Sequence, residues 1–98
     1  MNKPEDFGCV IVDHHSKGTY AKETRVPAGV MVLQHVHEFD HLSIVGKGRA
    51  LLTVNDEAPR ILEQGTCVNI KAGQKHQVQA ITDVTWFCIW PDNIEALE

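Results

Sequence analysis

The chain has no two cysteines close together. Its three cysteines, Cys9, Cys67 and Cys88, are an odd number spread across 98 residues. Neither a disulfide framework nor a Cys-x-x-Cys metal site is therefore indicated. Because free thiols persist in a reducing compartment, we expect the protein to be cytoplasmic.

Clusters of positive charge are also absent. The chain has nine Lys and Arg residues against 13 Asp and Glu, which gives a net charge of −4, and its basic residues are scattered. Nucleic acids and anionic membranes bind basic surfaces, so we expect neither as a partner. We expect a small-molecule ligand or substrate instead.

The third absence is a long hydrophobic run. A transmembrane helix needs about 18 consecutive apolar residues, and every apolar run in this chain is much shorter. Residues 1–6 are polar and do not resemble the apolar part of a secretion signal. With 43% hydrophobic and 22% charged residues, the 98-residue chain is expected to form a single globular domain over residues 1–98.

What the chain does contain is a series of short β-prone runs separated by turn residues. The runs are 9–12, 20–26, 30–37, 42–45, 50–54, 60–63, 66–70, 76–81 and 84–90. Short strands with turns about every 8 to 12 residues predict an all-β sandwich or barrel. The tail, 93–98, is predicted to form one helical turn capped by Asp92 or Asn93.

Three of the six histidines lie within seven residues, at His35, His37 and His41. On a helix, the segment 37–41 reads HExxH, the zinc-protease pattern. On a strand, His35 and His37 point to the same face because side chains alternate. β-branched residues precede the segment and two glycines follow it closely, so the strand interpretation is favoured.

The strand interpretation places a demand on His41. A straight chain would put it about 13 Å from His37, too far for both to bind one ion at about 2.1 Å. We therefore expect a tight turn at 38–40, after which the strand starting near His41 pairs back along the first. A fourth histidine, His76, follows a Gly-Gln-Lys turn, and by itself such a histidine is usually exposed.

Other polar side chains leave alternatives open. His14 and His15 fall in a predicted turn, 13–18, and are expected to be solvated. Cys67 and Cys88 are expected in the core. The catalytic acid or base is unknown, and four side chains either project inward or are solvated: Tyr20, Glu23, Arg25 and Arg49.

The spacing of glycines and histidines resembles two motifs of the cupins. The first, G-x5-H-x-H-x3,4-E-x6-G, is matched by Gly29, His35, His37, His41 and Gly48, with His41 where glutamate is usual. The second, G-x5-P-x-G-x2-H-x3-N, is matched by Gly65, Lys71, Gly73, His76 and Ala80, with Lys71 for proline and Ala80 for asparagine. The resemblance covers about residues 26–90.

The resemblance implies a double-stranded β-helix, the cupin jelly-roll barrel, of about 8–10 short antiparallel strands. Its core would span about 26–90, with a strand segment at 8–26 before it and a tail at 91–98. The family's metal ligands carry over onto His35, His37, His41 and His76. They imply one divalent transition metal per chain, with Mn, Fe, Ni, Cu and Zn all open.

The His41 departure has a predicted chemical effect. Three histidines and a carboxylate leave a divalent ion with a formal charge of about +1, whereas four neutral imidazoles leave it at about +2. The site should therefore favour an anionic ligand. By alternation, the apolar pocket wall would include Met31, Leu33, Val45, Val78 and one face of 86–90.

Two functions of different classes follow from the resemblance. One is a metal-dependent enzyme, an oxygenase acting on a small chelating or enolic substrate, with an isomerase or lyase as its redox-neutral variant. The other is a non-catalytic cupin that binds or senses a small ligand. The family also implies a homodimer, in which residues 9–12 or the last strand cross to the partner.

Overall fold

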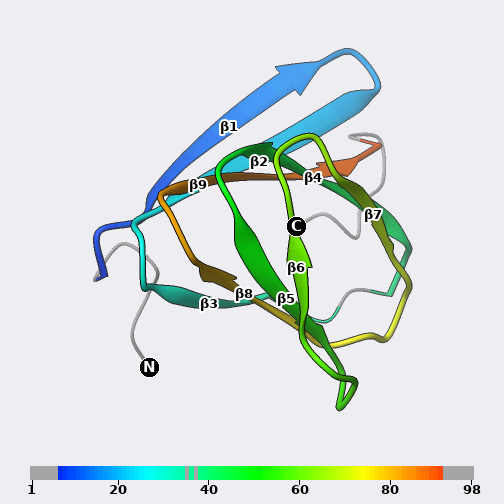
Figure 1. Cartoon of the computed structure of the whole chain (residues 1–98). Coiled ribbons are helices and arrows are strands. Elements are labelled where there is room, and N and C mark those ends of the chain that lie inside the picture. Colours follow the sequence, from blue (N-terminus) through cyan, green and yellow to red (C-terminus); the bar gives the residue numbers. More distant parts are fainter. Residues whose placement is uncertain (1–6, 35, 37, 92–98) are drawn as a thin grey trace.

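The computed structural model describes residues 7–34, 36 and 38–91, and this part of the chain forms nine strands (Figure 1). They are β1 (Val10–Ser16), β2 (Thr19–Val26), β3 (Met31–Gln34), β4 (His41–Lys47), β5 (Ala50–Val54), β6 (Arg60–Leu62), β7 (Cys67–Ile70), β8 (His76–Ala80) and β9 (Val84–Trp90).

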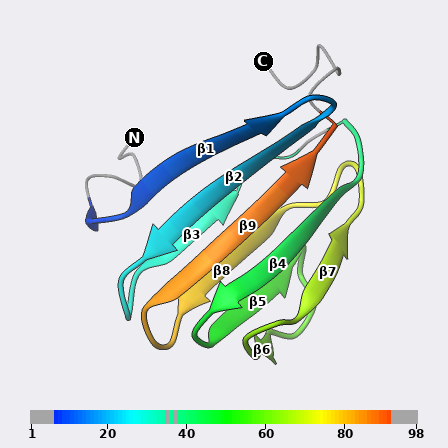
Figure 2. The same cartoon turned by 90° about the horizontal axis from the view of Figure 1, so that it is seen from above.

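The strands form two antiparallel sheets. One has the order β1-β2-β9-β4-β7 and the other β3-β8-β5-β6. Figure 2 looks onto the five-stranded sheet, with the four-stranded sheet beneath it. The predicted all-β, double-sheet architecture is confirmed.

Alternation along the strands builds the core between the sheets. In β9, Val84, Trp86, Cys88 and Trp90 are buried while the residues between them are only partly covered. β5 and β8 repeat this pattern, with Leu52 and Val78 among the most buried side chains. Burying a side chain of this size stabilises the fold by about 1.5–3 kcal/mol, so the inward positions define the register.

The turn from β4 to β5 depends on Gly48. Its φ is +86°, a conformation that side chains disfavour. A Cβ placed there would lie 2.1 Å from the backbone oxygen of Asp83, and Asp83 belongs to the loop between β8 and β9. Only glycine therefore fits where these two loops meet.

The turn predicted at 13–18 is shorter than expected. β1 continues to Ser16, which pairs with Thr19, so Lys17 and Gly18 alone form the connection to β2. His14 and His15 are therefore strand residues, so the loop assignment was wrong, although both are exposed as predicted. As neighbours on a strand they face opposite sides of the sheet.

The pairing expected after the 38–40 turn was also wrong. β4 does begin at His41, but it pairs with β7 and β9, whereas β3 pairs with β8 in the other sheet. The chain crosses between the sheets at this point. β3 and β4 therefore belong to the two different layers that enclose the core.

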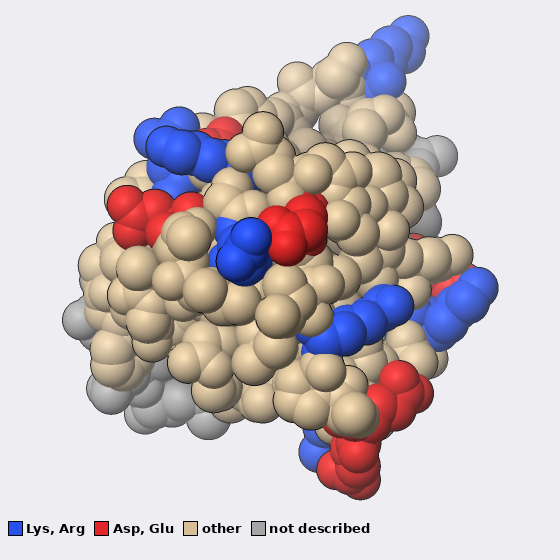
Figure 3. Space-filling view, viewed as in Figure 1, with Lys and Arg blue, Asp and Glu red and all other residues tan. Residues whose placement is uncertain are grey.

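Two further observations bear on the expected partners. In Figure 3 the Lys and Arg side chains on the visible face lie among Asp and Glu side chains, and no basic patch stands out there. None of the described residues belongs to a helix long and apolar enough to span a membrane. The helical turn predicted at 93–98 lies outside the described residues.

Candidate metal centre

Two of the four predicted ligands meet inside the barrel. His41 starts β4 and His76 starts β8, and the two strands belong to different sheets. Both side chains point inward, being 4% and 3% exposed. Their ring centroids are 5.6 Å apart, with the ring planes at 45°. His76 is thus buried, against the exposure usual for a lone histidine.

The other two predicted ligands, His35 and His37, lie outside the described residues. Among the residues that are described, no group of three or more His, Cys, Asp or Glu side chains is placed to hold a metal. The pair formed by His41 and His76 is therefore the part of the predicted site that the structure brings together.

The pair fits a shared transition-metal ion. With a metal–nitrogen distance of about 2.1 Å, the centroids of two imidazoles on one ion lie roughly 4.5–6 Å apart. The observed 5.6 Å falls within that range. Imidazole nitrogens suit Zn, Cu, Fe and Ni, so the donors also fit the class of metal.

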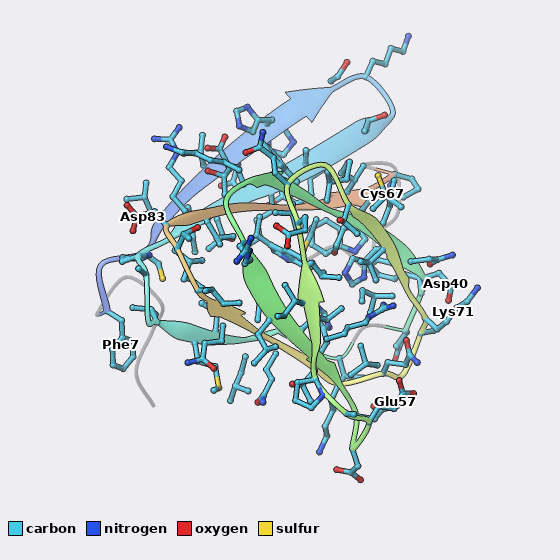
Figure 4. All side chains as sticks on the ribbon, in the orientation of Figure 1. Phe7, Asp40, Glu57, Cys67, Lys71 and Asp83 are labelled. Atoms are coloured by element: carbon cyan, nitrogen blue, oxygen red, sulfur yellow. The ribbon has the colours of Figure 1, made fainter. Side chains whose placement is uncertain are left out.

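The segments that precede the two histidines are held together. The backbone N–H of Ala72, between β7 and β8, donates to Oδ1 of Asp40 at 2.8 Å, and Lys71 lies 3.6 Å from the same carboxylate. Figure 4 shows Asp40 and Lys71 side by side at one end of the barrel. Lys71 stands at the motif position where proline is usual, and here its side chain makes an ion pair.

A group of aromatic rings lies on one side of His41. Trp90 lies 5.2 Å from it by ring centroids, and Tyr20 stacks on Trp90 at 5.3 Å with the planes 12° apart. Phe39 meets Trp90 edge-on at 6.3 Å. Sequence reasoning had put one face of 86–90 in the pocket wall without saying which face. The alternation of β9 was the available signal, because it puts Trp86, Cys88 and Trp90 on one face.

Tyr20 is one of the four polar side chains whose direction was open. Its hydroxyl donates to Oδ1 of Asp13 at 2.5 Å. Burial, together with this bond to a carboxylate, raises the pKa of Tyr20 far above its ordinary value. The phenol therefore keeps its proton across the neutral range.

Glu23 is buried, but not in the barrel. It is 7% exposed and pairs with Phe87 and Val12 on the outer side of the five-stranded sheet. His14 Nε2 lies 2.8 Å from one carboxylate oxygen, and Arg25 Nε donates to the other at 2.6 Å. The bond to His14, followed by that to Arg25, lowers the pKa of Glu23. The solvated interpretation of this carboxylate was wrong.

The remaining candidates have simpler surroundings. Arg25 and Arg49 are exposed, and Arg49 Nε donates to Glu63 at 3.1 Å. Cys88 is buried beside Ser43 at 3.5 Å, and burial raises the pKa of its thiol. Cys67 is exposed, so its expected place in the core was wrong. It lies on β7, at the edge of its sheet.

A pocket of about 590 Å³ opens beside His76. Its lining combines apolar, amide and charged side chains: Leu33, Val36, Thr53, Asn55, Asp56, Lys75, His76 and Gln77. A volume of about 300–1,000 Å³ is typical of small-molecule sites. Leu33, Thr53 and Gln77 occupy outward positions of their strands, so this pocket of small-ligand size opens on the outer side of the four-stranded sheet, whereas the His76 ring is buried in the interior.

The predicted apolar wall is only partly right. Val45 and Val78 point into the interior and are fully buried. Met31 and Leu33 are 48% and 74% exposed, because the inward position of β3 is Val32. Leu33 reaches the pocket only from the outer side of its sheet. The predicted alternation therefore assigned Met31 and Leu33 to the wrong face of β3.

A family model for the cupin domain matches residues 22–90. The chain belongs to the cupin family. A comparison with curated proteins found no match for this cupin.

Solved structures share the fold of this cupin at low sequence identity. An RmlC-like cupin with a double-stranded β-helix fold from Methanocaldococcus jannaschii is 19% identical, with a TM-score of 0.73 over 93% of this chain and 86% of that one. KdgF from Halomonas sp. is 19% identical, with a TM-score of 0.71 over 92% and 82%.

A third similar structure is an enzyme. Salicylate 1,2-dioxygenase from Pseudoaminobacter salicylatoxidans, solved with gentisate adducts, is 18% identical, with a TM-score of 0.79 over 92% of this chain. The match covers 27% of the dioxygenase, so this cupin spans about a quarter of that enzyme's length. These likenesses establish the double-stranded β-helix fold.

Proposed function

We propose that this cupin binds one divalent transition metal through His35, His37, His41 and His76. The observation that supports it is the meeting of His41 and His76, far apart in sequence, as two buried imidazoles at 5.6 Å. Burying a polar side chain is costly unless it makes strong interactions. A shared metal ion would supply such an interaction to both imidazoles.

When bound, the ion would supply Lewis acidity and, for a redox-active metal, one-electron chemistry. The protein would hold it with neutral imidazoles, which leave its charge of about +2 in place. Val45 and Val78 are fully buried in the barrel interior and keep that side apolar. These features favour a small anionic ligand.

The activity we propose is oxygenation of a small chelating or enolic anion, with an isomerase or lyase reaction as the redox-neutral form. The buried pair of imidazoles supports it, together with the fold that this cupin shares with salicylate 1,2-dioxygenase. The alternative is a cupin that binds or senses the same kind of anion without converting it.

The first experiment measures the metal content of the purified, untagged protein. We expect about one divalent transition ion per chain, and loss of that ion in His76→Ala. His14→Ala is the matched control, because His14 bonds to Glu23 on the outside of the sheet and should leave the metal content unchanged. Metal retained in His76→Ala would contradict the site.

The second experiment separates the enzyme from the binding protein. Oxygen uptake is followed with β-diketones, acireductones and flavonols for the iron, manganese, nickel and copper forms. Uptake that depends on both metal and substrate supports the oxygenase. If every form is inert while a compound raises the melting temperature, the protein is a binding or sensing cupin.

We also propose a cytoplasmic homodimer. The thiols of Cys67 and Cys88 are reduced, which supports a reducing compartment. β1 pairs only with β2, so within the described residues it forms a sheet edge on which a second copy can pair. The last strand, β9, lies between β2 and β4 and has no free edge, so the expectation that it crosses to a partner was wrong.

A further inference from the structure

Five rings form an unbroken series from the barrel interior to the surface. Starting at His76, the centroid separations are 5.6 Å to His41, 5.2 Å on to Trp90, 5.3 Å on to Tyr20 and 4.9 Å on to His15. The first three rings are buried, Tyr20 is partly covered and His15 is exposed. The series therefore joins the candidate metal centre to solvent.

The chemical order of the series is informative. Tryptophan and tyrosine are among the side chains that lose one electron most easily, and here they stand next to each other with nearly parallel planes. Tyrosine must also lose its proton when it is oxidised. The carboxylate of Asp13, 2.5 Å from the Tyr20 hydroxyl, is placed to accept that proton.

We propose that Trp90 and Tyr20 carry oxidising equivalents away from the metal centre to the surface, which protects His41 and His76 from oxidation. The proposal rests on the proposed metal site. It assigns a function to two aromatic residues that neither metal binding nor substrate binding requires.

The oxidant is a peroxide, and the electrons balance as follows. A reduced ion held by His41 and His76 would supply one electron to hydrogen peroxide, whose O–O bond would break to hydroxide and a hydroxyl radical. The radical takes an electron from Trp90 and becomes hydroxide, and Trp90 in turn takes an electron from Tyr20. The phenol proton moves to Asp13. Ascorbate then donates a hydrogen atom to the tyrosyl radical, and Asp13 releases its proton to water.

The ring contacts offer a matched control. Phe39 also touches Trp90, edge-on at 6.3 Å, but phenylalanine is hard to oxidise and lies outside the series. Phe39→Leu therefore removes an aromatic neighbour of Trp90 and leaves the route in place. Tyr20→Phe and Trp90→Phe keep a ring at each position and remove the group that is oxidised.

The test uses copper-loaded protein that is first reduced with ascorbate, freed of the ascorbate and then given hydrogen peroxide, after the copper content of every variant has been measured. Electron paramagnetic resonance detects the tyrosyl radical, and Tyr20 is the only tyrosine in the chain, so the signal has one source. Mass spectrometry measures oxidation of His41 and His76.

The wild type and Phe39→Leu should show the tyrosyl signal and little histidine oxidation. Tyr20→Phe and Trp90→Phe should lose the signal and show a severalfold rise in oxidation of His41 and His76. Asp13→Asn should lower the radical yield. Unchanged histidine oxidation in copper-loaded Tyr20→Phe and Trp90→Phe overturns the proposal, as does a copper-loaded wild type without the radical. A wild type that binds no copper instead contradicts the proposed metal site.

Discussion

Glu23 shows how a single residue can be misjudged from its neighbours in sequence. The carboxylate is covered because the β1–β2 hairpin brings His14 to one of its oxygens, while Arg25 reaches the other from two positions along β2. Nothing in the segment around Glu23 indicates this, since the covering histidine was placed in a loop. The prediction failed because the length of β1 was underestimated.

The lowered pKa of Glu23 makes its contribution to stability dependent on pH. The ionised form is favoured in the folded state, so its contribution is fully present above the ordinary value of 4.5 and is lost as pH falls through the lower, folded value. We expect the stability difference between wild type and Glu23→Gln to be constant from pH 7 to about 5 and to shrink below 4.5.

Urea denaturation of both proteins across this pH range checks the prediction. Arg49→Gln is a useful control, because its ion pair with Glu63 is exposed and should contribute little at any pH. A difference between wild type and Glu23→Gln that stays the same down to pH 3 would show that the carboxylate is not stabilised by its partners.

The interior position of two predicted ligands followed from the sequence more directly than the burial of Glu23. His41 and His76 were selected from their spacing relative to glycines, and the structure places both in the interior. Their surroundings were not foreseen, since Tyr20, Trp90 and Asp13 come together only through the pairing of β1, β2 and β9.

At the scale of elements, the turns were more informative than the strand pairings. The strands were found because β-branched runs alternate between glycine-containing turns, but which strands pair depends on contacts between distant segments. β3 and β4 are consecutive and were expected to pair, yet they lie in different sheets. Local pattern contains no signal for that crossing.

Gly48 gives a direct test of the turn between β4 and β5. Gly18 has nearly the same φ, +85° against +86°, but open space where a Cβ would be. Gly18→Ala should therefore cost only the backbone term of about 1–2 kcal/mol. Gly48→Ala should cost about 1–3 kcal/mol more, because the new Cβ meets the backbone oxygen of Asp83 and the loops must move.

Denaturation midpoints of the two alanine variants, measured side by side, provide the comparison. Equal destabilisation would mean that the two loops do not meet as closely as the structure indicates. The effect should appear in global stability, since Gly48 joins loops from both sheets.

At the scale of the whole molecule, β1 extends the five-stranded sheet beyond β2 and leaves an edge for assembly (Figure 2). We expect light scattering to give twice the chain mass of 10.9 kDa. Leu33→Lys, on the outer side of the other sheet, should not change this mass. A monomer mass for the wild type would contradict the homodimer, and a monomer mass for Leu33→Lys alone would place the interface on the four-stranded sheet.

The central claim is that His41 serves as a metal ligand where cupins usually carry glutamate. Titration calorimetry of the metal-free protein with Ni²⁺ tests it most directly. Wild type and His41→Glu should each bind one ion per chain, because both side chains are donors. His41→Leu should bind the ion about 10–100-fold more weakly. If His41→Leu binds Ni²⁺ as tightly as the wild type, His41 is not a ligand and the four-histidine site is wrong.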